Sequence, residues 1–252
     1  MSQDLSPFNT NKLMKKIAFF VEGQTEQFFI NKLLIEIAGQ KNIAINLRQL
    51  RGGSSMPKQD KFIPQVSSYA NPSNPVYEAL IYDCGNDDKV KSDILDNIAN
   101  LASSGYSEII GIRDLYPLPN TDLNKLEKGL QFIPQSMRPL PIPFEIIVAV
   151  NEIEAWFLSE CSHYECIDSR LTNSLIVTNS EFNPCKDDMT VRINPAQDLH
   201  KIYQLTGKAY SKKKNIVERT VNCLDYSILY LNIRNKISKL NDLIIKIDTF
   251  LT

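Results

Sequence analysis

The most constraining feature of this sequence is a series of short apolar runs, each followed by a segment with apolar residues at helical spacing. The runs have the length of strands buried on both faces, and the segments between them resemble amphipathic helices. Strands that alternate with helices predict an α/β fold with a mainly parallel, doubly wound sheet. The runs cover residues 17–21, 43–50, 76–83, 108–114 and 144–150.

The pattern changes after about residue 165, where strand signals fade and Leu/Ile-rich helical segments continue to the end. We therefore expect an α/β domain at 12–165 and a helical region at 166–252, packed on the core or extending it. Residues 54–75 are rich in proline, serine and asparagine, so we expect a long surface loop there.

Composition is that of a soluble globular protein, with 43% apolar and 23% charged residues. The net charge of -1 provides no overall positive field, so any contact with nucleic acid must depend on local basic patches. The sequence has no apolar stretch of membrane-spanning length and no signal-peptide pattern, and its five cysteines do not suggest a secreted disulfide framework. We expect a cytoplasmic protein with reduced thiols and no membrane partner.

Three of the predicted strands end in acidic residues: Glu22 after the first, Asp114 in the fourth, and Glu152 with Glu154 after the fifth. Glu26 lies one helical turn after Glu22, so the two can share a face. In open parallel sheets, ligands bind beyond the carboxyl ends of the strands. Crowded carboxylates repel one another unless a cation lies between them, and oxygen ligands suit Mg²⁺ or Mn²⁺. We predict that these five acids form a metal site.

A simpler interpretation is that acids near helix N-termini only stabilise the helix dipole, which applies to Glu22, Glu26 and Glu152. Convergence from three strands favours the metal site over this interpretation. A basic segment near the end of the chain is either a solvated face or a phosphate-contacting patch. Its candidate nucleic-acid-binding residues are Lys208, Lys212, Lys213, Lys214 and Arg219.

Other motifs give weaker signals. The stretch "CSHYEC" invites a zinc site, but its spacing differs from the usual Cys-x2-Cys, and buried cysteines and structural histidines are the better interpretation. The glycines of "RGGSS" lack P-loop spacing, so we expect no nucleotide hydrolysis by this chain. Trp156 lies among apolar neighbours and is expected in the core.

Four segments together resemble one family. "FFVEGQTEQFFINKLL" resembles the first strand and helix of a TOPRIM domain, the fold of topoisomerases, primases and the OLD-family (overcoming lysogenisation defect) nucleases. Its E-G-x-T-E form is typical of the OLD-like branch. "IIGIRDLYPLP", "VAVNEIEAWFLSE" and "GKAYSKKK" are similar to later segments of a related bacterial family. The resemblance spans about positions 15 to 215.

This resemblance implies a Mg²⁺-dependent nuclease that cuts DNA or RNA, often encoded beside an ABC/SMC-type ATPase in anti-phage defence. By position, Glu22 would be the metal-proximal acid or general base and Glu26 a second ligand. Asp114 would be the first acid of an Asp-x-Asp pair, and Glu152 and Glu154 the later acids. The resemblance implies that Lys212 neutralises charge in the transition state.

One position departs from the family, because Tyr116 stands where TOPRIM nucleases have a second aspartate. A phenol is a poor Mg²⁺ ligand at neutral pH, so two-metal catalysis is in question. Asp83, or Asp87 and Asp88 in the loop after the preceding strand, are candidates for the missing oxygen, and one-metal chemistry, or none, is also open. Two alternatives therefore stay open beside the nuclease: a catalytically inactive TOPRIM-like subunit that binds the ATPase, and a phosphatase or nucleotide-processing enzyme.

Overall fold

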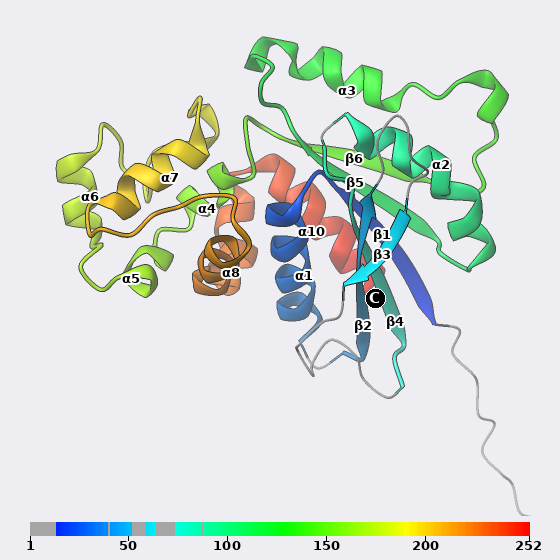
Figure 1. Ribbon diagram of the computed structural model, residues 1–252, viewed down its shortest axis with the longest axis horizontal. Coiled ribbons are helices and arrows are strands. Elements are labelled where there is room, and N and C mark those ends of the chain that lie inside the picture. The colour runs from blue at the N-terminus through cyan, green and yellow to red at the C-terminus, as the bar shows by residue number, and fades with distance from the viewer. Residues whose placement is uncertain (1–13, 40, 52–58, 64–73, 87) are drawn as a thin grey trace, which may run out of the picture.

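The computed structural model describes residues 14–39, 41–51, 59–63, 74–86 and 88–252, and Figure 1 shows an α/β architecture built on one six-stranded sheet. The strand order is β3-β2-β4-β1-β5-β6. Five strands run parallel, and only β3 pairs antiparallel, on the outer side of β2. The strands are β1 (Lys15–Val21), β2 (Ile43–Arg51), β3 (Gln59–Ile63), β4 (Tyr77–Asp83), β5 (Glu108–Asp114) and β6 (Phe144–Ala149). The predicted α/β class with a mainly parallel sheet is confirmed.

Helices cover both faces of the sheet, which explains why its central strands are apolar without alternation. Along β1, Phe19 belongs to the cluster formed with α1 (Gln24–Ala38) and α10 (Ser238–Phe250). The next residue, Phe20, faces the opposite cluster, which includes α2 (Lys89–Ser103). Helix α3 (Leu123–Gln131) packs beside α2 on that same side, over β6.

Gly111 in the middle of β5 allows this close packing. A Cβ atom there would lie 2.7 Å from Ile146 and 3.1 Å from Val90 and Ile94 of α2. The contact with the Ile146 side chain of β6 is shorter than packed carbon atoms tolerate, so a side chain at position 111 would require Ile146 to shift.

The region after β6 is helical, as expected. It contains α4 (Glu154–Ser159), α5 (His163–Ile167), α6 (Asn173–Asn179), α7 (Pro195–Gln204), α8 (Lys214–Cys223) and α9 (Tyr226–Leu231), in addition to α10. Short 3-10 turns lie at η2 (Asn120–Asp122), η3 (Gln135–Met137), η4 (Met189–Val191) and η5 (Ile233–Asn235). Between β5 and β6 the chain makes η2 first, and α3 begins at Leu123.

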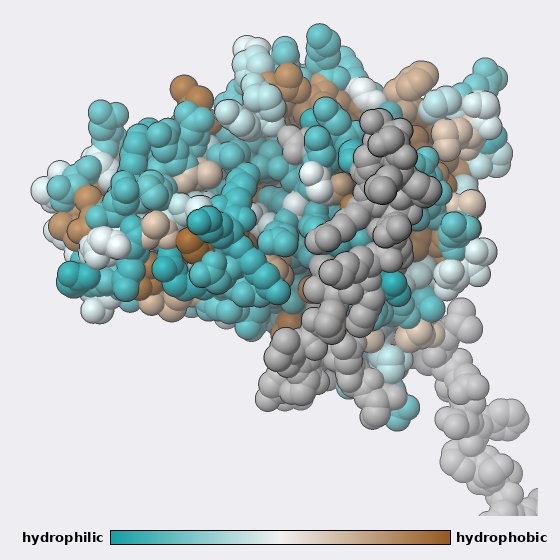
Figure 2. All heavy atoms as spheres, viewed as in Figure 1, coloured by the Kyte–Doolittle hydropathy of each residue, from teal (hydrophilic) through white to brown (hydrophobic). Residues whose placement is uncertain are grey.

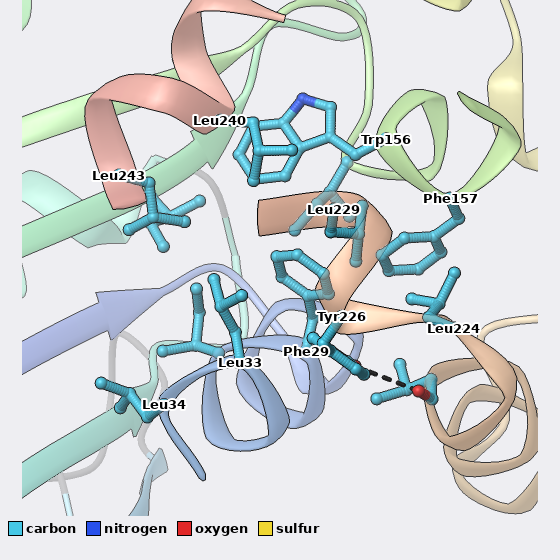
Figure 3. Packing of buried hydrophobic residues seen from close by; sticks show 14 of the residues in the cluster. Phe29, Leu33, Leu34, Trp156, Phe157, Leu224, Tyr226, Leu229, Leu240 and Leu243 are labelled. Carbon is cyan, nitrogen blue, oxygen red and sulfur yellow. Dashed lines mark hydrogen bonds between the residues drawn. The ribbon is translucent and has the colours of Figure 1, made fainter. Parts of the chain in front are cut away.

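The helical region shares one hydrophobic core with the sheet (Figure 3). The ring of Phe29 on α1 lies 5.8 Å from Trp156, 5.3 Å from Phe157 and 6.0 Å from Tyr226. Trp156 is fully buried, as predicted. The domain boundary near residue 165 stays a prediction, but the core itself crosses it.

Two expectations were wrong. Residues 54–75 were expected to be loop throughout, yet 59–63 form the edge strand β3, whose polar sequence gives no strand pattern; residues 52–58 and 64–73 lie outside the described part of the chain. Reduced thiols were expected, yet Cys161 pairs with Cys185 and Cys166 with Cys223. These partners are 24 and 57 residues apart, so helix packing rather than local spacing brings them together.

The surface seen in Figure 2 is mainly hydrophilic over the helical region at the left, with hydrophobic residues scattered between. Within the described ranges, no helix has the length and apolar character that crossing a membrane requires.

Candidate functional site

The acidic residues predicted from three strand ends meet at one edge of the sheet. Strands β1, β5 and β6 are parallel neighbours, so their carboxyl ends lie side by side. Glu22 follows the last residue of β1, Asp114 is the last residue of β5, and Glu152 follows β6 by a short turn. We call this group, with Glu26 and Glu154, the acidic edge.

The acidic edge consists of two sets of carboxylates that share one member. One oxygen from each of Glu22, Glu26 and Asp114 lies within 4.8 Å of the others, and the same holds for Asp114, Glu152 and Glu154. We call these the first set and the second set. The shared residue, Asp114, comes from the central strand of the three, which is why it reaches both.

Backbone hydrogen bonds hold the acids in place. Glu22 Oε2 accepts from the Asp114 backbone N–H at 3.0 Å, and Asp114 Oδ1 accepts from the Ile153 N–H at 3.0 Å. The turn between β6 and α4 is set by Asn151, which adopts φ 62° and donates from Nδ2 to the Thr190 carbonyl at 2.7 Å. Asparagine tolerates this left-handed conformation better than most residues. The turn directs Glu152 and Glu154 back toward Asp114.

The second set contacts the helical region directly. Glu152 Oε2 accepts from the Ala196 N–H at 3.1 Å, in the first turn of α7, and Glu154 Oε1 accepts from the Tyr210 hydroxyl at 2.7 Å. The Lys212 ammonium lies 3.4 Å from Glu152, 3.8 Å from Glu154 and 3.9 Å from Asp114. Lys212 is therefore part of the acidic edge although it lies in the loop before α8.

Two buried oxygens of the acidic edge have no hydrogen-bond partner: Glu26 Oε1 and Glu154 Oε2. A buried polar atom without a partner is costly, and in native structures it commonly marks a place where an ion or water binds. The ligand set is made only of carboxylate oxygens, which Mg²⁺ and Mn²⁺ prefer. The residues present thus fit a hard divalent cation.

The protonation equilibria reflect this crowding. Burial, with the charge of Glu154, raises the pKa of Glu26 to about 7. Burial, followed by the charge of Glu22, raises the pKa of Asp114 well above its ordinary value, and burial also raises that of Glu154. Burial lowers the pKa of Lys212, but its acidic neighbours outweigh this and raise it above the ordinary value, so Lys212 is charged. Glu26, Asp114 and Glu154 therefore keep a proton to higher pH than an ordinary carboxyl, and a bound cation would favour their ionised forms.

A cavity of about 360 Å³ opens onto the first set. Its lining includes Glu22, Glu26 and Lys212, and on the opposite wall Asp83 at the end of β4 with Gln49 of β2. Asp83 accepts from the Gly85 N–H at 2.9 Å and from Gln49 Nε2 at 3.1 Å. Asp83 therefore shapes the cavity, but within the described residues it does not join either set of possible ligands.

Among the described residues, Tyr116 and Asp88 belong to neither of the two sets. The Tyr116 side chain is 46% exposed, and its backbone N–H donates to the Asn151 carbonyl at 2.8 Å. Asp88 is exposed and pairs with Arg113 at 3.8 Å, and Asp87 lies outside the described residues. Within the described residues, the acids that form a set with Asp114 are Glu22 and Glu26 on one side and Glu152 and Glu154 on the other.

The basic segment is a loop and a first helical turn rather than one helix face. Lys208 pairs with Asp168 at 4.0 Å, and Lys214 pairs with Glu218 at 3.9 Å. Arg219 donates to the Ala209 carbonyl at 2.6 Å, which braces the loop. Lys213 precedes α8 and is exposed. Of the predicted phosphate-contacting residues, only Lys212 contacts the acidic edge within the described structure.

Tyr210 was not predicted from the sequence as a site residue. Its hydroxyl donates a hydrogen bond to Glu154, and its ring lies 6.2 Å from that of Tyr203. The signal for it was its position two residues before Lys212 in "GKAYSKKK". No zinc site forms at "CSHYEC" in the described structure, because both its cysteines are in disulfides and His163 is buried against Glu160.

A comparison with protein families gives one match over most of the chain. Residues 21–241 match the family model described as a domain of unknown function, DUF4276. The chain belongs to the DUF4276 family. The match begins one residue before Glu22 and continues beyond Lys212, so this DUF4276 domain contains the whole acidic edge. Neither the curated proteins nor the solved structures compared with it gave a match.

Proposed function

We propose that this DUF4276 protein is a metal-dependent phosphodiesterase, a nuclease effector that cuts DNA or RNA. The observation that carries the proposal is the acidic edge: two carboxylate sets share Asp114, and two of their buried oxygens lack a partner. The resemblance of four sequence segments to TOPRIM nucleases supports the same activity. Glu22, Glu26, Asp114, Glu152 and Glu154 are the proposed metal ligands.

A bound Mg²⁺ or Mn²⁺ would supply Lewis-acid stabilisation of charge on the phosphate oxygens. Residues of the chain would stabilise further charge and transfer protons. The ammonium of Lys212, which is 48% exposed and lines the cavity, can face a phosphate oxygen and neutralise its developing charge. Because the pKa of Glu26 is about 7, its carboxyl can take up or release a proton near neutral pH in the ion-free protein.

The proposed partners follow from the resemblance alone. We propose that an ABC/SMC-type ATPase subunit controls the nuclease in anti-phage defence, and that the protein acts in the cytoplasm, where its nucleic acid substrate lies. The low net charge of -1 is consistent with substrate binding that depends in part on the ATPase.

A test compares Glu22→Ala with Glu36→Ala, a change of the same type in an exposed glutamate at the other end of α1. We expect wild-type protein with Mn²⁺, alone or with its ATPase, to cleave a polynucleotide, and Glu22→Ala to lose about a thousandfold in rate. Glu36→Ala should cleave like wild type. Cleavage that persists in Glu22→Ala would refute the assignment, and hydrolysis of small phosphoesters instead of polynucleotides would favour the phosphatase.

One observation favours a second function, a catalytically inactive subunit that binds the ATPase. Tyr116 replaces an acid and is exposed, and the only ammonium at the acidic edge in the described structure lies against the second set. Under this alternative the protein binds the ATPase but neither Mg²⁺ nor Mn²⁺ at millimolar concentration. Isothermal titration with metal and with the ATPase separates the two functions.

A further inference from the structure

The two carboxylate sets of the acidic edge differ in what already compensates them. Lys212 lies within 4.0 Å of Asp114, Glu152 and Glu154, which are all three members of the second set. In the first set, Lys212 pairs with Asp114, the member that both sets share, while Glu22 and Glu26 line the cavity.

We propose that the Lys212 ammonium takes the place of a second metal ion, so that the acidic edge binds one divalent cation, in the first set. This inference rests on the proposed metal site and specifies its stoichiometry. A divalent ion placed among the acids of the second set would lie a few ångströms from the ammonium, and two cations at that separation repel strongly away from bulk water.

The hydrogen bonds of the two sets support this assignment. In the second set, Glu152 accepts from the Ala196 N–H and Glu154 accepts from the Tyr210 hydroxyl, in addition to their ion pairs with Lys212. In the first set, the buried Glu26 has an oxygen without a partner and lines the cavity, so a ligand can reach it. Glu154 of the second set also has a buried oxygen without a partner, but Glu154 is not part of the cavity lining.

The loop that carries Lys212 is built to hold it there. Tyr210, two residues earlier, is buried and anchored to Glu154 through its hydroxyl, and its carbonyl oxygen lies 2.8 Å from His200 Nδ1 on α7. Arg219 on α8 donates to the carbonyl of Ala209 from the other side. The loop just before Lys212 is thus held by contacts with α4, α7 and α8.

This arrangement answers the question that Tyr116 raises. A second metal ion needs carboxylates that are not already paired with a cation. In this chain, the three carboxylates of the second set already pair with the ammonium of Lys212. Lys212 would then be the permanent counterpart of the second ion, close enough to the cavity to act on the phosphate that the first ion binds. Removing its charge should open the second set to a metal ion.

The test measures Mn²⁺ stoichiometry by equilibrium dialysis and electron paramagnetic resonance at pH 8, which needs no substrate and no activity. We expect one bound Mn²⁺ per chain for wild type and two for both Lys212→Ala and Lys212→Met. Lys201→Ala, a change in an exposed lysine of α7, should bind one. Two closely spaced Mn²⁺ ions in the Lys212 variants should also show spin coupling.

A double variant locates the second ion. Lys212→Ala combined with Glu152→Gln should return to one Mn²⁺, because the second set then lacks a carboxylate. Two ions in wild type, or one in both Lys212 variants with native thermal unfolding, would overturn the inference but leave the metal site intact. No binding in wild type would instead overturn the proposed metal site itself, so the two failures are distinguishable.

Discussion

Two regions of this molecule contain glutamates that are equally buried but differ in how fully their carboxylates are hydrogen-bonded. In the helical region, Glu160 is fully buried and accepts hydrogen bonds from the Ser162 N–H and hydroxyl and from the N–H groups of His163 and Asp225. At the acidic edge, Glu26 and Glu154 are equally buried, yet each has an oxygen without a partner.

The difference lies in how completely the hydrogen-bonding capacity of each buried carboxylate is satisfied. Glu160 links the end of α4 to the starts of α5 and α9, so its charge is compensated by the fold. Glu26 and Glu154 each keep one buried oxygen without a hydrogen-bond partner, which fits the metal site that we propose. Burial alone does not identify a site, whereas burial without hydrogen-bond partners, repeated in one cluster, does.

The largest change in the free energy of unfolding is expected when a disulfide bond of the helical region is removed. Removing the Cys166–Cys223 disulfide, which closes 57 residues, should lower the free energy of unfolding by about 4 kcal/mol in the chain-entropy model. The matched control is the Cys161–Cys185 bond over 24 residues, whose loss should cost about 0.8 kcal/mol less. Urea unfolding of the paired Cys→Ser variants, with and without dithiothreitol, measures both. Identical unfolding under oxidising and reducing conditions would show that the disulfides do not form.

The next largest effect is expected for Glu160→Gln. The amide keeps one acceptor but loses the charge and introduces a donor among donors, so we expect a loss of about 3 kcal/mol in unfolding free energy. Mn²⁺ binding should be unchanged, since Glu160 belongs to neither carboxylate set. Denaturant unfolding and metal titration check the two parts, and a neutral effect on stability would remove the contrast with Glu26.

Glu26→Gln should instead raise the free energy of unfolding at high pH. An acid whose pKa rises from 4.5 to about 7 on folding binds more protons in the native state between those values, so the ion-free protein loses stability as pH rises through that range. At pH 8 the glutamine variant should therefore be more stable than wild type by about 2 kcal/mol. The gain should vanish at pH 4.5. Thermal unfolding from pH 4.5 to 8 tests this, and a destabilised variant at pH 8 would contradict it.

The smallest effect is expected from the metal itself. A divalent ion that binds only the native state stabilises it by about 1.4 kcal/mol at ten times its Kd. The shift in melting temperature should grow from pH 6 to pH 8, because ionised carboxylates bind the ion. Calorimetry with and without Mn²⁺ measures it, with Glu26→Gln expected to show a smaller shift. An equal shift in Glu160→Gln would confirm that the two regions act independently.

The sequence predicted much of the fold because its signals were local. Apolar runs gave five strands, and helical spacing in residues such as Phe29 and Leu33 gave α1. The edge strand β3 could not be predicted, since the sequence of residues 59–63 has no continuous apolar run and its pairing with β2 is a long-range backbone contact. The acids of the candidate site were also found from sequence, because parallel strands bring their ends to one edge.

What the sequence determined by itself is therefore the parallel sheet and the identity of its terminal acids, since periodicity and strand ends are properties of short segments. Only the tertiary structure decided that Asp114 is shared by two sets, that Lys212 lies against one of them, and that four cysteines pair. These contacts join residues far apart in the chain. Their geometry is set by packing of the helices on the sheet, which no local pattern encodes.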